Sequence, residues 1–431
     1  MPSSAPLHFG RRLRLAGPLG PWMGNVAAPL AAPQFRRLWL FTCASNLLRW
    51  MELTITSWIA LQLTGSPWLV ALAGVCRAAP LPLVGPFSGM LADRYDRVLL
   101  VRFAQWGKLV PLALLTGTFL TGHGAYWQLL VVSVWLGVSW SLEWPSRRSL
   151  LGDLVGPELL LRAAVLDNAT MAGTRVIGPL LAGILLAMWG SAAYGAVVLL
   201  PVLALVALSQ LATRRDIQPA QATSVWQQLR GGFAYVRREQ TIWAVILITV
   251  AMNFFIFPSQ QLFSVVAEHV LRVGPVQLGW MGAANGLGAT LGLLFLPRVS
   301  RIGGRGWVFA GGSIVAAVAL GLFAGSTTLW LSLVLLVLSG FGHTGFSVMQ
   351  ATLVLSHATP EMRGRAMGVM TLAIGSSPLG NLEQGLIAEQ WGAPVAIGSS
   401  ALLCAVIVTL VAWWSPRLLR PRPTPQPAPA R

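Results

Sequence analysis

Apolar runs of about 20 residues recur along this chain from Phe35 to Trp414. A helix that rises about 1.5 Å per residue needs about 20 residues to cross the ~30 Å hydrocarbon layer of a membrane. The chain has 431 residues, of which 55% are hydrophobic and only 10% charged, and a soluble domain of this size is far more polar. The sequence therefore predicts a multi-pass membrane protein.

The apolar runs predict an all-α membrane fold with twelve transmembrane helices in two six-helix bundles. A disordered N-terminal tail is expected over 1–35, the first bundle over 36–212, a linker over 213–241, the second bundle over 242–414 and a Pro- and Arg-rich tail over 415–431. The expected spans are 36–62, 68–92, 98–121, 126–145, 161–188, 192–212, 242–267, 276–297, 306–325, 329–355, 365–388 and 393–414.

The basic residues lie in every second connection and at both ends of the chain. The formal charge is +17, and every basic residue except Lys108 is arginine. The connections between the arginine clusters carry no lysine or arginine, with the exception of Arg272. This alternation follows the positive-inside rule, so it predicts that both termini are cytoplasmic and argues against nucleic-acid binding.

The two halves of the chain resemble each other. The segment DRYDR at 93–97 has a counterpart in PRVSR at 297–301, where the arginines recur 204 positions later. The segment PELLLRA at 157–163 matches PEMRGRA at 360–366, shifted by 203 positions. Two matches at nearly one offset indicate a duplicated six-helix unit.

A helix is also predicted between the two bundles. Trp226, Leu229, Phe233 and Val236 recur at helical spacing, and the arginines of this segment fall off that stripe. We expect an amphipathic helix in the cytoplasmic interface that joins two rigid bundles, and the alternative is a regulatory or lipid-sensing role.

One loop motif carries a family resemblance. Residues 89–97, GMLADRYDR, are similar to the G-x-L-x-D-R-x-x-R signature of the major facilitator superfamily, although Val98 stands where a basic residue is usual. The resemblance covers nearly the whole chain. It implies that the loop latches the cytoplasmic side in one transport state, and the plainer interpretation is a set of solvated loop charges. The implied latch residues are Gly89, Asp93, Arg94 and Arg97.

A second motif points to the direction of transport. Gly178, Pro179 and Gly183 resemble the G-P-x-x-G-G core of the proton-coupled exporters in this superfamily, with Ala182 in place of one glycine. The segment PSRR at 145–148 and the segment at 360–366 are similar to the enterobactin-exporter-like branch of siderophore and drug exporters. The resemblance therefore implies export.

Charged residues at membrane depth cost several kcal/mol each and need a partner or a wet cavity. Glu52, one turn from Arg49, best fits a proton-coupling carboxylate, and a permanent structural ion pair is the alternative. The proton-coupling candidates are Arg49, Glu52, Asp167 and Arg175. The cavity candidates are Asn46, Arg77, Asn253, Asn285 and His343. Lys108, Glu143 and Glu383 complete the charges at comparable depth.

The predicted function is secondary active transport by alternating access, most simply proton-coupled export of a small amphipathic drug, siderophore or secondary metabolite. No G-x-x-x-x-G-K-[ST] loop occurs, and the three cysteines show no metal-site spacing, so no ATP, metal or other cofactor is expected. The expected partners are cargo, protons and membrane lipid, in a monomer of the bacterial inner membrane. The alternatives are an importer on the same fold or a membrane-embedded enzyme acting on lipid-linked substrates.

Overall fold

The computed structural model of the protein describes residues 27–211 and 225–419, and these two ranges contain helices and no β-strand. Most of the tail expected over 1–35 lies outside the described residues, as do 212–224 of the linker and 420–431 of the C-terminal tail. Short helices occupy the described ends: η1, Ala28–Ala31, precedes the first span, and α17, Pro416–Leu419, follows the last.

The first bundle holds six spans. Proline begins several of them, because its missing N–H costs nothing in a first helical turn. Gly65 ends the first span in the left-handed conformation, at φ 64°. The spans are α2 (Pro33–Thr64), α3 with α4 (Pro67–Ala78 and Pro80–Arg94), α5 (Arg97–Leu120), α6 (Tyr126–Leu154), α7 (Pro157–Trp189) and, after η2 (Gly190–Ala192), α8 (Ala193–Ser209).

The second bundle repeats this plan. One of its helices, α12, changes direction at Gly304, where φ is 75°, and so contributes two spans, Pro275–Leu296 and Gly304–Ala324. The first span of this bundle is built from α10 (Gln240–Ala251), η3 (Met252–Ile256), η4 (Phe257–Gln260), α11 (Phe263–Val265) and η5 (Val266–Val270). The next three are the two spans of α12 (Pro275–Ala324) and α13 (Leu329–His357). After η6 (Pro360–Met362), the last two are α14 (Arg363–Ile374) with α15 (Ser377–Trp391), and α16 (Ala393–Trp414).

Hydropathy separates nine of these spans from the other three. Eight stretches of described helix are long and apolar enough to cross a membrane, and one of them, Glu158–Ser209, contains both α7 and α8. The three less apolar spans are α2, α6 and the α14–α15 pair. The first two carry Glu52 and Glu143, both almost fully buried. Polar side chains inside the bundle therefore lower the hydropathy of these spans without exposing charge to lipid.

Three spans are broken near their middle. The break after α3 lies at Ala79 and Pro80, the long interruption after α10 contains Pro258, and the break between α14 and α15 precedes Pro378. Proline removes a backbone hydrogen-bond donor and opens the helix. Irregular backbone at membrane depth is tolerated only where protein or a cavity covers it, so these breaks point to the interior of the molecule.

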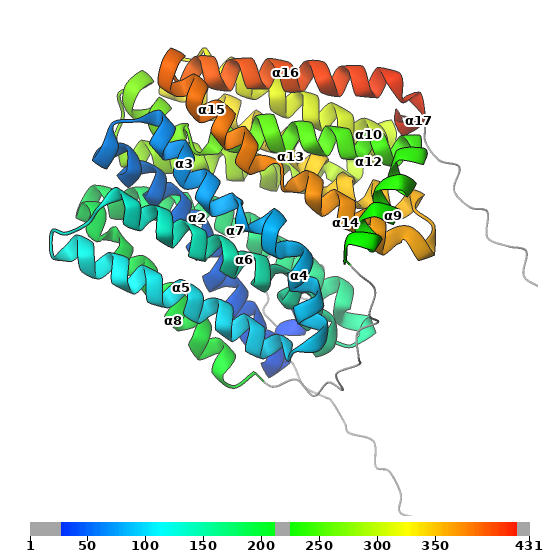
Figure 1. Ribbon diagram of the computed structural model, residues 1–431, viewed down its shortest axis with the longest axis horizontal. Helices are drawn as coiled ribbons and strands as arrows, with labels where there is room; N and C mark the ends of the chain where they lie inside the picture. Colours follow the sequence, from blue (N-terminus) through cyan, green and yellow to red (C-terminus); the bar gives the residue numbers. More distant parts are fainter. Residues whose placement is uncertain (1–26, 212–224, 420–431) are drawn as a thin grey trace, which may run out of the picture.

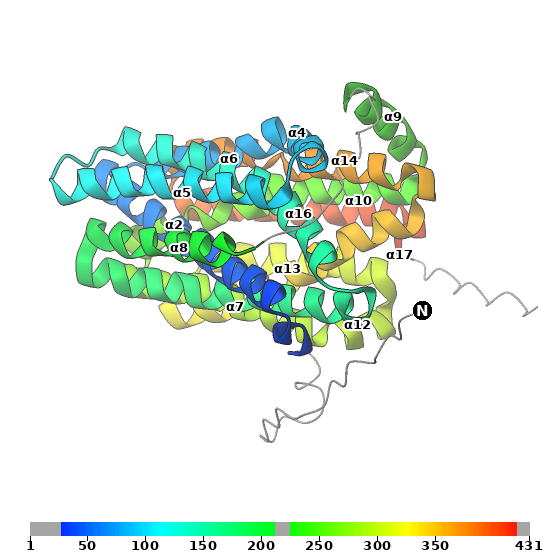
Figure 2. The ribbon, with the colours of Figure 1, turned by 90° about the horizontal axis from the view of Figure 1, so that it is seen from below.

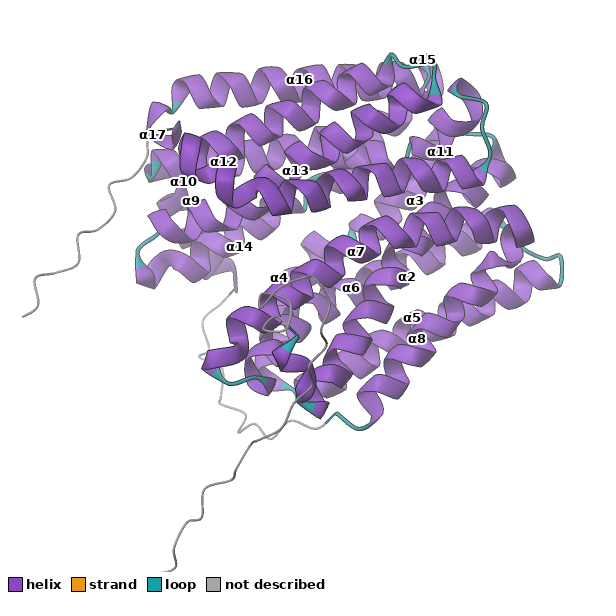
Figure 3. Cartoon of the chain, turned by 180° about the vertical axis from the view of Figure 1, so that it is seen from behind, coloured by secondary structure: helices purple, strands orange, loops and turns teal. Residues whose placement is uncertain are grey.

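The two bundles lie side by side, α2–α8 in one and α10–α16 in the other (Figure 1). Figure 2 shows both bundles from below, and in Figure 3 α7 runs beside α12 at the boundary. We call the end with Gly65, Gly122 and Gly325 the arginine-poor end and the opposite end the arginine-rich end. The broadest contacts between the bundles pair α7 with α12 and α3 with α15.

The linker helix α9, Val225–Arg238, packs against α14. Its glycines allow the close approach, since a Cβ on Gly232 would lie 2.7 Å from the Arg365 carbonyl oxygen. The buried face therefore runs through Gly232 and Val236. Phe233, which belongs to the apolar stripe that we expect in the cytoplasmic interface, lies off this buried face and is 47% exposed, so the interfacial placement of the stripe stays a prediction.

Candidate functional site

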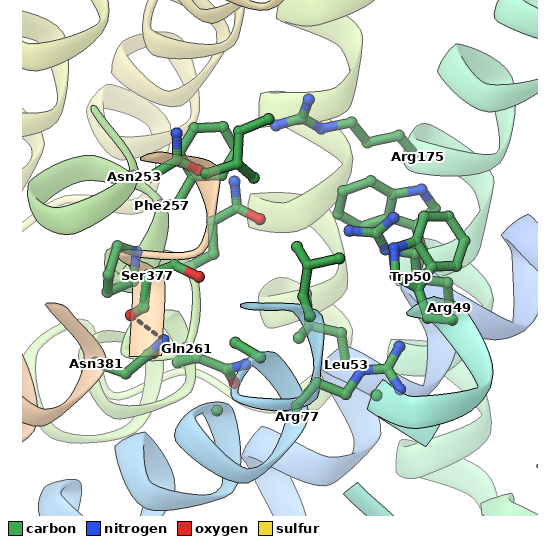
Figure 4. Close-up of a pocket in the computed structure, with 18 residues that line it drawn as sticks. Arg49, Trp50, Leu53, Arg77, Arg175, Asn253, Phe257, Gln261, Ser377 and Asn381 are labelled. Atoms are coloured by element: carbon green, nitrogen blue, oxygen red, sulfur yellow. Dashed lines mark hydrogen bonds between the residues drawn. The ribbon is translucent and has the colours of Figure 1, made fainter. Parts of the chain in front are cut away.

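A cavity of about 230 Å³ lies between the bundles at the level of the helix breaks. All three broken spans line it: Arg77 and Leu81 flank the first break, Asn253 and Pro258 lie in the second, and Ser377 follows the third. Figure 4 shows side chains from both bundles around this space. The opened backbone and the cavity thus occur together, as in transporters whose substrate site is formed by discontinuous helices.

Arginine and tryptophan form the wall contributed by the first bundle. The Arg49 guanidinium lies 3.9 Å from the ring centroid of Trp140 and 5.5 Å from that of Trp50. Arg175 lies 5.1 Å from the Trp50 ring on its own side and donates a 2.7 Å hydrogen bond to Asn285 in α12 of the other bundle. Stacking on an aromatic face stabilises a guanidinium where water is scarce.

Arg77 pairs with Glu52 behind the cavity wall. The Arg77 Nη1 and Glu52 Oε2 atoms are 3.2 Å apart, and the Glu52 side chain is 2% exposed. Thr56 donates a 3.0 Å hydrogen bond to the other oxygen of Glu52, and the hydroxyls of Thr56 and Tyr194 are 2.7 Å apart. The expectation that Glu52 pairs with Arg49 was wrong: Arg49 turns into the cavity to stack on tryptophan, and α3 brings Arg77 to the carboxylate instead.

The cavity lining is positively charged. Arg49, Arg77 and Arg175 line it, and no acidic residue does within the described part of the chain. In the same ranges, Arg49 and Arg175 have no carboxylate oxygen within 4.0 Å. Of the three arginines, only Arg77 has its charge offset, by the carboxylate of Glu52. An organic cation that enters this space therefore meets uncompensated positive charge.

The second bundle supplies amides, a hydroxyl and an aromatic ring. Asn253 and Phe257 come from the interruption after α10, and Gln261 follows them (Figure 4). Asn381 donates a 2.9 Å hydrogen bond to the carbonyl oxygen of Ser377, and its own carbonyl oxygen is buried without a donor among the described residues. This wall offers hydrogen bonds but no charge.

The predicted cavity residues divide into three groups. Arg77 and Asn253 line the main cavity, and Asn285 lines an adjoining space of about 30 Å³. Asn46 and His343 line neither space. His343 packs instead against Phe257, with ring centroids 4.5 Å apart. The sequence reasoning assigned no cavity role to Trp140, Gln261, Ser377 or Asn381, and the Ser-Ser-Pro segment at 376–378 was the signal for a break near the last two.

A second group of buried charges lies deeper in the first bundle. Lys108 of α5 contacts Glu143 of α6 and donates a 2.7 Å hydrogen bond to Ser45 of α2. Ser45 and Gln105 donate to the two oxygens of Glu143 at 2.6 and 2.7 Å. Because every charged group in this network has a partner, the network holds α2, α5 and α6 together and leaves no charged group available to bind cargo.

Asp167 is also held by an arginine. Arg147 of α6 lies 2.5 Å from Asp167 of α7, and the Asp167 side chain is 18% exposed. All four ion pairs found in the described ranges lie in the first bundle. Those ranges hold no group of three or more His, Cys, Asp or Glu side chains that would fit a metal ion.

The predicted latch lies at the arginine-rich end. Asp96 caps the start of α5 by accepting hydrogen bonds from the backbone N–H groups of Val98 and Leu99 at 2.7 and 3.1 Å. Arg97 contacts Asp153 of α6 at 2.6 Å. Gly89, Asp93 and Arg94 belong to α4, but their side-chain environment lies outside the described part of the structure, so the latch remains a prediction.

The glycine and proline motif of α7 packs at the boundary between the bundles. A Cβ on Gly183 would lie 2.5 Å from the Pro275 carbonyl oxygen, and one on Gly279 would lie 2.6 Å from the Pro179 carbonyl oxygen. Gly178 faces the other way, where a Cβ would lie 2.6 Å from the Trp50 Cβ. Small residues thus let α7 approach both α2 and α12.

Cross-bundle hydrogen bonds close the arginine-poor end. Glu389 of α15 accepts hydrogen bonds from the Ser66 hydroxyl at 2.8 Å and from the Trp68 backbone N–H at 3.0 Å, so it caps α3 from the other bundle. Gln62 of α2 donates to Glu268 of η5 at 2.7 Å. We call these two contacts the arginine-poor gate.

Removing the Glu389 contact should loosen the arginine-poor gate. We expect Glu389→Ala to raise thiol labelling of a Leu53→Cys reporter in the cavity, from the arginine-poor side, by about fivefold, because an exposed charge-assisted contact contributes ~1 kcal/mol. The neighbouring exposed Gln390, replaced by alanine, is the matched control. Equal labelling in both variants would show that Glu389 does not hold the gate.

The transmembrane secretion effector family has a sequence model that matches residues 24–418, nearly the whole chain. The chain belongs to this family of the major facilitator superfamily. The twelve spans that the described residues form, six in each bundle, are the fold of that superfamily, and its members are transporters.

Curated relatives of this chain are named as exporters. The enterobactin exporter EntS of Shigella boydii serotype 4 (strain Sb227) is 26% identical over 405 residues, which cover 90% of this chain and 94% of the relative. EntS of Escherichia coli O139:H28 (strain E24377A / ETEC) has the same identity and coverage. The similarity therefore spans both bundles.

Solved structures share the fold at low sequence identity. The POT family transporter PepTSo has a TM-score of 0.71 at 14% identity, covering 90% of this chain and 98% of its own. A bacterial homolog of the human lysosomal transporter Spinster, in an inward-facing and unoccupied conformation, has a TM-score of 0.64 at 16% identity, with 91% and 99% coverage.

Proposed function

We propose that this family member is a proton-coupled exporter of small amphipathic molecules that works by alternating access. The observation that carries the proposal is the cavity between the bundles, with arginines and tryptophans on one wall and amides on the other. A polar, aromatic space at the pivot of two bundles suits a cargo that is released to one side after binding from the other. The exporter relatives support the outward direction.

The cavity suits aromatic cargo without positive charge. Trp50 and Phe257 offer faces for stacking, and Asn253 and Gln261 offer hydrogen bonds. Aromatic groups also stack on guanidinium planes, which Arg49 presents beside its tryptophans. This composition favours an uncharged amphipathic drug, siderophore or secondary metabolite over an organic cation.

Glu52 and Arg77 are the proposed coupling pair. Arg77 belongs both to the ion pair and to the cavity lining. Protonation of Glu52 would therefore remove the negative charge that offsets the charge of Arg77. A proton on Glu52 leaves an uncompensated arginine at the wall, which attracts water and weakens the binding of an apolar cargo. Proton binding therefore opposes cargo binding. Proton-driven export needs this opposition, because the proton and the cargo then favour different states of the cavity.

The proposed setting is the bacterial inner membrane, with both termini in the cytoplasm, a monomeric chain, and cargo, protons and lipid as partners. An importer on the same fold is the second candidate. Inverted membrane vesicles separate the two, because an exporter accumulates cargo inside them and an importer accumulates it in right-side-out vesicles. Accumulation only in right-side-out vesicles would overturn the proposal.

Cargo charge gives a direct test of the cavity. We expect the uncharged aromatic dye Nile red to be exported at least about tenfold faster than the permanent cation ethidium, because repulsion by unpaired arginines at short range exceeds ~1.4 kcal/mol. Asn253→Asp adds a carboxylate to the lining and should narrow the difference in export rate between Nile red and ethidium. Asn253→Leu, which is similar in size but uncharged, should leave that difference unchanged. Wild-type export of ethidium at the rate of Nile red would contradict this assignment.

A further inference from the structure

A second hollow lies where the linker helix meets the second bundle. It is a groove of about 840 Å³ between α9 and α14, and Leu229, Phe233, Ala234 and Leu372 form its apolar part. Phe233 is 47% exposed and Leu372 39% exposed. An aromatic and a leucine side chain left open beside a transmembrane span indicate that something apolar covers them.

The direction of α9 explains how the groove forms. Leu229 lies near Gly368, and Gly232 lies against Arg365, so the two helices run antiparallel. Tyr235 continues the series, since its hydroxyl accepts a 3.1 Å hydrogen bond from the Thr359 backbone N–H. With this face of α9 fixed on α14, Phe233 is turned outward along the open side of the helix.

The rim of the groove is basic. Arg230, Phe233 and Arg237 are spaced three and four residues apart, so they share one face of α9, and Arg238 also lines the groove. All three arginines are exposed, and none has a carboxylate within 4.0 Å in the described ranges. Arg365 lies against Gly231 nearby, and Glu239 is the one acidic residue adjacent to α9 in the sequence.

We propose that this groove binds an anionic phospholipid, with its phosphate held by Arg230, Arg237 and Arg238 and its acyl chain lying on Phe233 and Leu372. Charge complementarity selects an anionic lipid as the occupant. A peptide helix or a neutral lipid would cover the apolar residues of the groove but would leave three exposed guanidinium groups without an anionic partner. The site joins the linker to α14, the helix that leads to the cavity break at Ser377. A bound lipid would therefore fasten the linker to the second bundle.

The test measures lipid retention on the full-length purified protein by native mass spectrometry, with dioleoyl phosphatidylglycerol as the probe. We expect Arg230→Gln with Arg237→Gln to weaken apparent affinity by about 30-fold, which corresponds to ~2 kcal/mol for two arginines near a lipid headgroup. The matched control is Arg305→Gln with Arg417→Gln, which removes two exposed charges from the arginine-rich end of the same bundle.

Any of three results would overturn the proposal. The first is retention of dioleoyl phosphatidylcholine as strong as that of phosphatidylglycerol, and the second is an equal loss of affinity in the control pair and the groove pair. The third is complete displacement of the lipid by free glycerol phosphate, which would indicate a site for soluble anions. Thermal unfolding of each variant in detergent checks folding. The assay reads lipid binding directly, so its outcome does not depend on whether the chain exports cargo.

Discussion

Glu52→Gln is expected to abolish the part of export that depends on the pH gradient, lowering proton-driven efflux by about tenfold or more. Glutamine keeps the size of the side chain and can still accept from Thr56, but it carries no charge and cannot titrate. Arg77 then remains uncompensated at every pH. The measurement is accumulation of an uncharged fluorescent dye in inverted vesicles and its efflux from right-side-out vesicles, with and without an imposed pH gradient.

Glu383→Gln provides the matched control. Glu383 lies in α15 of the second bundle, where its carboxylate accepts a 3.3 Å hydrogen bond from Ser400. No arginine or lysine lies within 4.0 Å of it in the described ranges. Its replacement should leave the pH dependence intact. If Glu52→Gln vesicles respond to the gradient as the wild type does, the coupling carboxylate lies elsewhere, and Asp167 becomes the next to test.

Gly183→Leu should halt the transport cycle by forcing α7 away from α12. A Cβ alone would already approach the Pro275 carbonyl oxygen to 2.5 Å and the Gly279 Cα to 3.1 Å, both backbone atoms that cannot rotate aside. Overpacking of this kind costs ~1–3 kcal/mol, and it acts on the contact between α7 and α12 that this structure has with its arginine-poor end closed. We expect export to fall by about tenfold or more.

The same variant should also expose the cavity. A Leu53→Cys reporter in a chain without its native cysteines should label faster from the arginine-poor side when Gly183 is replaced. Gly173→Leu is the control on the same helix, because a Cβ there meets no atom within 4 Å. Loss of export in both variants would point to a general effect on α7. Labelling unchanged by Gly183→Leu would show that the motif does not act on the arginine-poor gate.

Pairing was the part of the candidate site that sequence spacing predicted poorly. Arg49 and Glu52 are one turn apart on a single helix, which made them the simplest pair to expect. Helical neighbours with this spacing compete with partners from adjacent helices, and α3 places Arg77 against the buried carboxylate. Arg49 instead gains two tryptophan faces. Nothing in a linear sequence ranks these alternatives, because each depends on how the helices rotate about their axes.

The cavity candidates show the same limit. Asn46, Asn253 and His343 all sit in apolar runs, so each one predicted a polar group that needs a partner. Asn253 falls at a helix break and faces the cavity, whereas His343 falls in a continuous helix and packs on aromatic rings. Prolines marked the breaks, but only packing decided which polar side chains turned toward them.

The sequence by itself determined that the chain folds in lipid, that it has twelve spans and that it contains a duplicated unit. These features follow from apolar run length, arginine placement and repeated loop segments, which are properties of the chain to which lipid and water respond directly. Tertiary structure decided which arginine meets Glu52, which face of α9 is left open and how the glycines of α7 close on α12. Those outcomes depend on the rotation and approach of helices far apart in sequence, and steric fit between bundles fixes them only once both have folded.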